Sequence, residues 1–381
     1  VRGPGLAEAW RHVGTLAGDA NDIVGASAGF DPVALQWARA LARQATHVRE
    51  DLRLLAPWLE RDGPAPGGTS AAIPTLRELA GWDPDPADPL ACLGAQRAAA
   101  RLRSLAELAR QAGALADMDF AFLYDRTRRQ FTIGYNVTEH RADTSYYDLL
   151  ASEARLASFV AIARDQVPQE HWFALGRLLT RAGGDPVLVA WSGSLFEYLM
   201  PLIVMPAYGN TLLAQTCLAA VERQVDYGRQ RGVPWGISES GYNTVDGQLN
   251  YQYRAFGVPG LGLKRGLAED LVVAPYASAL ALLVVPEDAC RNLQRLAGEG
   301  LAGELGLHEA IDYTPSRLRG GETGAVVRSY MAHHQAMSLV AIASVLLGRP
   351  MQRRFAAEPQ FKATLLLLQE RIPRGAAFHP H

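Results

Sequence analysis

The sequence has few cysteines, and those present follow no metal-binding or disulfide spacing. Cys92, Cys217 and Cys290 lie far apart, each in a stretch of helical character. Such isolated thiols fit neither a zinc site nor a disulfide framework, and they suit a reducing compartment. The cysteines therefore predict no structural metal and no covalent cross-link in this fold.

A strong charge of one sign is also missing. The formal net charge is −2 for 381 residues, and acidic and basic side chains are mixed along the chain. A nucleic-acid-binding surface needs a concentration of Lys and Arg that neutralises phosphates. Because no basic patch stands out, we do not expect nucleic acid as a partner.

Long hydrophobic runs are missing as well. The most apolar stretch, residues 271–285, has about fifteen residues and contains Pro275, whereas a transmembrane helix needs roughly 20 apolar residues. We therefore expect no membrane span in this chain. The chain begins at Val1 with neither a Met nor a signal-peptide pattern, and we expect it to be a part of a longer protein.

Three common enzyme motifs are absent: the Gly-x-Ser-x-Gly elbow, the Walker loop and the dinucleotide-binding fingerprint. The sequence Gly-Leu-Gly-Leu at residues 260–263 lacks the third glycine and the strand context of that fingerprint. A hydrophobic content of 49% is nevertheless ample for a large core. The length indicates one large domain, or one domain with an appended module.

Helical periodicity dominates the first part of the chain. Residues 31–60 and 90–115 place apolar side chains on one helix face, and Asp31-Pro32 has the pattern of an N-cap followed by proline at N1. Residues 62–69 are rich in Pro and Gly and predict a linker. We expect residues 1–115 to form an N-terminal helical segment that carries no chemistry.

Residues 116–381 combine further helices with elaborate connections, and we expect them to form the catalytic domain. Residues 120–125 and 130–136 predict a small β-hairpin. Helices are expected near residues 147–165, 171–182, 194–204, 211–231, 277–285, 289–298, 326–347 and 360–371. A long series of helices with functional loops on alternate connections predicts an all-α toroid, an (α/α) barrel. A plain α-solenoid is the alternative, but no fixed-period repeat supports it.

The most informative stretch is residues 233–263, where Gly and Pro indicate loop structure. It holds Glu239 between two serines, close to Trp235 and Tyr242, without a capping pattern to explain the acid. An aromatic, partly dry setting raises the pKa of a carboxyl, as a general acid requires. Carboxyl groups also perform the bond chemistry of sugar-processing enzymes. A Tyr-rich core with one surface Glu is the alternative interpretation.

Two other clusters contain acids close to helix starts. Asp148 and Glu153 lie five residues apart at the start of an expected helix, where an acid also matches the helix dipole. Ser194 and Glu197 have the Ser-x-x-Glu spacing of a capping box, which favours a structural role for Glu197. Glu153 is therefore the stronger of these candidates for catalysis.

A fourth cluster combines Glu309-Ala-Ile-Asp312 with the adjacent pair His333-His334. Neighbouring residues on a helix point about 100° apart, so the two histidines do not easily share one metal. The zinc-protease spacing His-Glu-x-x-His is also absent. We expect no metal, and we expect one of the histidines to face a site and to hydrogen-bond a hydroxyl group.

A family resemblance is carried by residues 146–160, 191–201, 233–243, 255–275 and 329–339. Together these stretches resemble the glycoamylase-like middle region of bacterial cyclic β-1,2-glucan synthases. The resemblance covers roughly residues 118–373, and the preceding helical segment is similar to the one that precedes this region in those enzymes. It implies an (α/α)6 toroid with long catalytic loops, related to endo-β-1,2-glucanases.

The resemblance also implies an activity, namely cyclisation of linear β-1,2-glucan by intramolecular transglycosylation. A reaction that keeps the β linkage needs a nucleophile and an acid/base, which by position look like Glu153 and Glu239 respectively. The order of roles within this pair stays open. Related glucanases are thought to protonate the leaving oxygen through a substrate hydroxyl, so the two carboxyls could lie farther apart than the usual 5–5.5 Å.

Further residues are expected to line the sugar subsites, and no cofactor is implied. The sequence departs from the family pattern at His308, where an aromatic residue is usual, and at Ala336, where glycine is usual. Either change could alter chain-length preference or the balance between cyclisation and hydrolysis. The candidate substrate-binding residues are Tyr135, Tyr146, Asp148, Trp191, Trp235, Tyr242, Tyr251, Arg254, Glu309, Asp312 and His334.

The resemblance places the chain in a large inner-membrane parent protein, as a soluble domain on the cytoplasmic side. Its expected partners are the linear glucan and the neighbouring glycosyltransferase and phosphorylase-like domains. Two rival functions remain: an endo-β-1,2-glucanase, with water as acceptor, and a non-catalytic glucan-binding scaffold. A phosphorylase is a weaker third, because no phosphate-binding cluster is evident.

Overall fold

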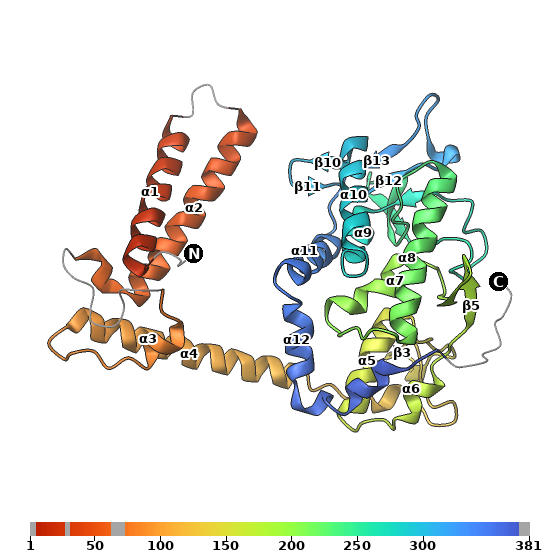
Figure 1. Cartoon of the computed structure of the whole chain (residues 1–381), viewed down its shortest axis with the longest axis horizontal. Helices are drawn as coiled ribbons and strands as arrows, with labels where there is room; N and C mark the ends of the chain where they lie inside the picture. The colour runs from red at the N-terminus through yellow and green to blue at the C-terminus, as the bar shows by residue number, and fades with distance from the viewer. Residues whose placement is uncertain (1–4, 27–30, 62–72, 373–381) are drawn as a thin grey trace. The chain divides into compact units, whose positions relative to one another are not determined.

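The computed structural model describes residues 5–26, 31–61 and 73–372 (Figure 1). The predicted linker at residues 62–69 lies outside these ranges. The chain divides into two compact units, Val1–Met118 and Asp119–His381, and each is described by itself.

The first unit is helical in its described residues. Helix α2 begins with Asp31 as N-cap and Pro32 at N1, as predicted, and α4 spans the predicted helix at residues 90–115. The expected helix at residues 31–60 is interrupted at Ala56, where α2 gives way to a 3-10 turn. The elements are α1 (Leu6–Gly25), α2 (Pro32–Leu55), η1 (Pro57–Glu60), α3 (Leu76–Ala80) and α4 (Pro89–Leu115).

Close packing of α4 against Trp58 organises this unit. Trp58 is 2% exposed, and its ring meets Trp82 edge to face at a centroid distance of 5.3 Å. Gly94 of α4 lies directly against it, since a Cβ atom there would come within 2.4 Å of Trp58 Cζ3 and 2.7 Å of the Leu55 carbonyl oxygen. A glycine inside a helix lowers helix propensity, and here it makes room for the indole ring.

The second unit is also mainly helical, which confirms the helical part of the fold prediction, whereas the closed toroid stays a prediction. Helix α9 lies at the centre, in contact with α7, α10 and α11. The helices are α5 (Ser152–Ala163), α6 (Glu170–Ala174), α7 (Leu195–Leu199), α8 (Leu212–Arg231), α9 (Pro275–Ala281), α10 (Pro286–Leu296), α11 (Ala332–Leu346) and α12 (Pro350–Ala357). The shorter turns are η2 (Ala121–Leu123), η3 (Met200–Ile203), η4 (Ala297–Leu301), η5 (Pro315–Arg317), η6 (Pro359–Phe361) and η7 (Thr364–Gln369).

Small antiparallel sheets connect these helices, in greater number than the single predicted hairpin. Among the residues that the structure describes, five of these sheets are two-stranded pairs, and one has three strands in the order β13-β12-β9. The pairs are β1 (Tyr124–Asp125) with β2 (Gln130–Phe131), β3 (Tyr135–Asn136) with β4 (Arg141–Ala142), β5 (Leu179–Ala182) with β6 (Asp185–Leu188), β7 (Ser240–Val245) with β8 (Tyr251–Arg254), and β10 (Ala302–Gly303) with β11 (Gly306–Leu307). The three-stranded sheet contains β9 (Val272–Val273), β12 (Ala310–Asp312) and β13 (Ala325–Val327).

Three helix predictions need correction. The helix expected at residues 171–182 ends at Ala174, and strand β5 then turns back into β6 through Gly183 and Gly184. These glycines have φ angles of 60° and 101°, a backbone region that favours glycine. The helix expected from residue 326 begins only at Ala332, after strand β13, and residues 360–371 form 3-10 turns.

The most apolar stretch of the sequence forms the centre of the core. It contributes strand β9 and helix α9, and every residue of both is buried. No helix in the described part of the chain is both long enough and apolar enough to span a bilayer. Burial in a protein core therefore accounts for this apolar run.

We predict opposite effects for two glycine substitutions on helix α4. Gly94→Ala would force the new methyl group into Trp58 and should lower the free energy of unfolding by about 1–3 kcal/mol. Gly113→Ala is the matched control, because nothing lies within 4 Å of its Cβ position; it should raise stability by about 0.5–1 kcal/mol. Urea unfolding followed by circular dichroism measures both, and equal effects would contradict the close contact at Trp58.

Candidate active site

A cavity of about 420 Å³ brings the two predicted catalytic carboxyls together. Its lining comes from three segments that are distant in the sequence. Glu153 and Glu239, which belong to separate motifs, thus line one cavity together with aromatic side chains. The lining residues are Ile133, Ser145, Tyr146, Tyr147, Asp148, Ala151, Glu153, Trp191, Phe196, Glu197 and Glu239.

Glu153 lies in the first turn of helix α5 and is exposed to the cavity. The N-terminal end of a helix stabilises negative charge. Asp148 builds the approach to this helix, because its Oδ1 accepts the backbone N–H groups of Leu150 at 2.8 Å and Ala151 at 3.0 Å. Burial raises the pKa of the Asp148 carboxyl. Asp148 therefore shapes the turn that presents Glu153, in addition to lining the cavity.

The predicted capping box at the start of helix α7 is confirmed. Glu197 Oε2 accepts the Ser194 N–H at 3.1 Å, and the Ser194 side chain accepts the Glu197 N–H in return. Ser192 adds a short hydrogen bond of 2.5 Å from its hydroxyl to the same carboxylate oxygen. Glu197 lines the cavity as well, so it forms a fixed negative wall of the site.

Glu239 lies directly before strand β7, half-buried, and is held at two points. Its carboxyl Oε2 accepts the Tyr253 hydroxyl at 3.3 Å, and its backbone oxygen accepts the Tyr276 hydroxyl at 2.9 Å. Burial raises the pKa of Glu239, the Tyr253 hydrogen bond opposes that rise, and the negative charges of Glu197 and Glu153 add to it. A raised pKa is the property that a general acid requires.

Behind Glu239 lies a buried pair of ionisable groups. His334 Nδ1 is 2.9 Å from Glu309 Oε1, and the two side chains are almost fully buried. The ring of His334 stacks on Tyr276 at a centroid distance of 3.7 Å. Its Nε2 atom is 3.5 Å from the Tyr253 hydroxyl. Both predicted residues thus form an inner layer, one contact removed from Glu239.

A cluster of ions anchors the β7–β8 hairpin that follows Glu239. Arg317 bonds to Asp312 at 2.6 Å and to Asp270 at 2.5 Å, and Asp270 also pairs with Arg254. Both guanidinium groups lie over the Tyr242 ring, at 5.0 Å for Arg317 and 5.3 Å for Arg254. Three of the predicted substrate-binding residues therefore support one another in this cluster, and their contact with sugar stays a prediction.

The remaining predicted aromatic residues occupy three different settings. Trp235 is 7% exposed and belongs to the hydrophobic core, so packing accounts for it. Tyr251 of β8 packs against the same core, and Tyr135 of β3 meets Phe122 edge to face at 5.5 Å. Trp191, in contrast, is 66% exposed at the cavity. Of Trp191 and Trp235, Trp191 therefore has the ring that is exposed for stacking against a ligand.

Sequence reasoning missed Tyr253, which touches Glu239. The Gly and Pro residues of 233–263 predict loop structure, whereas β7 and β8 form a hairpin in which Gly241 lies opposite Tyr253. Glu239 lies two residues before Gly241, so it is the diagonal neighbour of Tyr253 on the same face of the hairpin. The connection between β7 and β8 spans residues 246–250, and the register shifts between Tyr242 and Val245. A two-residue turn at Asp246-Gly247 would instead place Gln252 opposite Gly241, so the turn signal alone does not supply this register.

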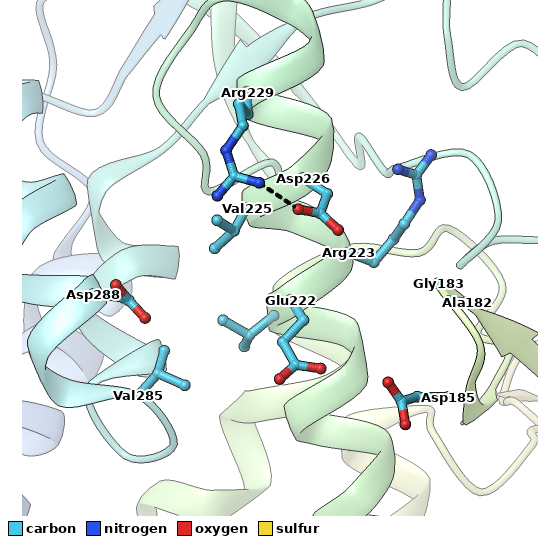
Figure 2. Close-up of a pocket in the computed structure, with 11 residues that line it drawn as sticks. Ala182, Gly183, Asp185, Glu222, Arg223, Val225, Asp226, Arg229, Val285 and Asp288 are labelled. Atoms are coloured by element: carbon cyan, nitrogen blue, oxygen red, sulfur yellow. Dashed lines mark hydrogen bonds and ion pairs between the residues drawn. The ribbon is translucent and has the colours of Figure 1, made fainter.

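A second cavity, of about 290 Å³, lies elsewhere in the unit (Figure 2). Figure 2 shows Glu222 of helix α8 between Asp185 and Asp288, with Asp226 paired to Arg229 at 2.8 Å. Burial and the nearby acids raise the pKa of Glu222. None of the predicted site residues lines it, and it has no aromatic lining. Within the described residues, no group of three or more His, Cys, Asp or Glu side chains is arranged to hold a metal ion.

The chain is similar in sequence to a bacterial glucan synthase. The chain is 49% identical over 257 residues to the cyclic β-(1,2)-glucan synthase NdvB of Rhizobium meliloti (strain 1021). That match covers 68% of this chain and 9% of the relative, so the chain spans a small part of the longer protein.

A solved structure matches more of the chain, and a family model matches its middle part. An endo-β-1,2-glucanase from Talaromyces funiculosus, in complex with sophorose, is similar over 97% of this chain and 84% of its own, with a TM-score of 0.52 and 15% identity. At that identity the similarity concerns the fold alone. The glycoamylase family model, described as "Putative glucoamylase", matches residues 145–357, which is more than half of the chain and includes Glu153 and Glu239. The chain therefore belongs to the glycoamylase family.

Proposed function

We propose that the second unit is an anomer-retaining transglycosylase that cyclises linear β-1,2-glucan. The observation that carries this proposal is the cavity in which Glu153 and Glu239 meet, beside the exposed ring of Trp191. Membership of the glycoamylase family supports a glycosyl-transferring or hydrolytic enzyme domain. The close relative, a cyclic β-(1,2)-glucan synthase, supports the choice of polymer and product.

In the proposed reaction the two carboxyls act in turn. Glu153 attacks C1 of a glucose unit and forms a glycosyl-enzyme, while Glu239 supplies the proton that leaves with the released glucan oxygen. A hydroxyl at the non-reducing end of the bound chain then attacks C1. Glu239 takes the proton of that hydroxyl, the ring closes, and the Glu153 carboxylate is restored.

Different surroundings support this division of roles. Glu153 lies in the first turn of helix α5 and is exposed to the cavity, where a nucleophile can reach C1 of a bound sugar. Burial raises the pKa of Glu239, and a general acid must be protonated. The half-buried carboxyl is therefore the better candidate for the acid/base, and the exposed one for the nucleophile.

The relative is much longer than this chain, which supports a place for the unit within a larger, multidomain protein. The chain spans 9% of the NdvB protein, which leaves room for the glycosyltransferase and phosphorylase-like domains expected beside it. We propose that the unit receives linear glucan from such neighbours on the cytoplasmic side of the bacterial inner membrane. Cyclisation would then follow polymerisation in the same protein.

Product analysis tests the function. Linear β-1,2-glucan is incubated with wild type, Glu153→Gln and Glu239→Gln, and the products are weighed by mass spectrometry. Wild type should give species lighter by one water than the matching linear chains, and each variant should lose this activity by about 10²–10⁴-fold. Glu222→Gln, in the second cavity, is the control and should retain it.

Two other outcomes of the same experiment decide against cyclisation. Shortened linear products from wild type mean that water is the acceptor and that the unit is an endo-glucanase. Glucan binding without turnover, retained in both variants, means that the unit is a binding scaffold.

Trapping of the intermediate tests the order of roles. A β-linked glucosyl fluoride needs little acid assistance, so Glu239→Gln should still form the glycosyl-enzyme but turn it over slowly. Peptide mapping by mass spectrometry should then find the sugar on Glu153. A sugar attached at position 239 of the Glu153→Gln variant would reverse the assignment.

Trp191 should contribute to glucan binding. Loss of its ring in Trp191→Ala removes a stacking contact worth about 1 kcal/mol, so KM for the glucan should rise about fivefold. The free energy of unfolding should change by less than about 0.5 kcal/mol, because the side chain is exposed. Trp37→Ala, at an exposed tryptophan of the first unit, is the control for KM. An unchanged KM in Trp191→Ala would exclude this ring from the subsites.

A further inference from the structure

The geometry behind Glu239 carries an inference that rests on the proposed acid/base role of this residue. Tyr253 lies between two groups that compete for its hydroxyl hydrogen. Its oxygen is 3.3 Å from Glu239 Oε2 and 3.5 Å from His334 Nε2. A tyrosine hydroxyl has one hydrogen to donate and lone pairs with which to accept. Tyr253 can therefore serve only one of the two acceptors at a time.

The orientation of His334 is fixed from its other side. Glu309 approaches Nδ1 at 2.9 and 3.0 Å and also accepts the Gly241 N–H at 3.1 Å. The second ring nitrogen, Nε2, is thereby directed at Tyr253. A carboxylate partner at Nδ1 keeps the proton there and leaves Nε2 as an acceptor. Stacking on Tyr276 holds the plane of the ring.

The absence of a side chain at Gly241 makes this arrangement possible. A Cβ atom at Gly241 would lie 3.3 Å from Glu309 Cγ and 3.3 Å from Val327 Cγ1. Glycine thus lets the buried carboxylate approach the hairpin closely. The same residue pairs with Tyr253 across the strands, so the hairpin register and the buried pair are aligned.

We propose that Tyr253 is a positioning residue whose hydroxyl hydrogen is given to Glu239 when that carboxyl is ionised and to His334 when it is protonated. In the second state the Glu239 carboxylic acid donates its own hydrogen to the Tyr253 oxygen. No covalent bond is made or broken, since only the hydroxyl group rotates. Glu239 thereby keeps a hydrogen bond both as acid and as base, whereas His334 Nε2 receives the Tyr253 hydrogen only when Glu239 is protonated.

Charged and titratable groups from several elements face this switch. Around Glu239 these are Glu153 of α5, Glu197 of α7, Tyr253 of β8, Tyr276 of α9 and His334 of α11. Around Tyr253 they are Glu239, Glu309, His333 and His334. Burial and the charge of Glu239 raise the pKa of Tyr253, and burial lowers the pKa of His333. Tyr253 therefore stays a neutral donor while Glu239 titrates.

Direct titration of Glu239 is the first test, and it needs no substrate. The protein is labelled with ¹³C at the glutamate carboxyls, and the Glu239 signal is identified by its absence in Glu239→Gln. Tyr253→Phe removes a hydrogen bond from both forms of Glu239, but the bond to the ionised carboxylate is charge-assisted and stronger. The pKa of Glu239 should therefore be higher than in wild type. Tyr251→Phe, on the same strand but packed against the core, should leave it unchanged. Equal titration in Tyr253→Phe and wild type would overturn the proposal.

The histidine half of the switch has its own measurement. In protein labelled with ¹⁵N at histidine, the His334 Nε2 signal of wild type should move as Glu239 titrates, because it gains and loses a donor. Tyr253→Phe should abolish this response, and His333 is the internal reference. An Nε2 atom that carries a proton throughout the titration would overturn this half.

Activity provides a third and separate readout. In Tyr253→Phe, kcat/KM should fall about tenfold, and its alkaline limb should move to higher pH, because the general acid then keeps its proton longer. The acidic limb, set by the nucleophile, should stay in place. A fall in kcat/KM without movement of the alkaline limb would mean that Tyr253 has a structural role only. If wild type proves inactive, the two titrations still decide the inference, so its failure is distinguishable from failure of the proposed function.

Discussion

The site depends on one close backbone contact between two loops. Gly257 and Gly262 lie against Ser192, so closely that a Cβ atom would be 1.6 Å and 2.5 Å, respectively, from the Ser192 carbonyl oxygen. No other residue fits at such a distance. This contact places the segment of Trp191 and Glu197 beside the segment of Glu239, and the start of α7 is further tied to it by the Phe196 N–H on Ser238 Oγ at 2.9 Å. Without the glycines, the walls of the cavity would separate.

Two groups of charged side chains, an inner and an outer layer, support Glu239 and the hairpin that follows it. The inner layer, Glu309 with His334, is buried and faces Glu239 through Tyr253. The outer layer, Arg317 with Asp312 and Asp270, fixes the hairpin. Removing one partner of a buried ion pair is strongly destabilising, so both layers keep the proposed acid in a constant environment. Rigid support of this kind is what precise acid/base chemistry needs.

Much of the structure could be predicted from local patterns. Helix α4, the Asp31-Pro32 helix start and the Ser194-Glu197 capping box follow from short-range rules, and the structure confirms them. Glu153 and Glu239 are the catalytic candidates that the family resemblance implies. Their place in one cavity is consistent with that resemblance. Long-range features are harder to predict, because the periodicity of hydrophobic residues does not reveal which aromatic side chain is buried.

Trp235 and Tyr253 illustrate that difficulty. Both are aromatic residues of the same Gly- and Pro-rich stretch, yet Trp235 packs into the core and Tyr253 contacts Glu239. The difference arises from strand register, which the turn and the partner strand set together. Likewise, residues 175–182 leave the helical conformation because two glycines allow the chain to reverse into β6. The closed toroid involves the assembly of many helices, and it stays a prediction.

Helix α9 has a consequence for the dynamics of the protein. All seven of its residues are buried, and its Tyr276 binds the backbone oxygen of Glu239. Amide hydrogens in such a helix exchange with solvent only when the whole unit opens. The backbone at Glu239 is therefore fastened to a fully buried helix that should exchange slowly, whereas Trp191 is exposed at the cavity. The wall of the cavity that contains Glu239 should therefore remain rigid until global unfolding. The wall that contains Trp191 is the one that can adjust to the glucan chain.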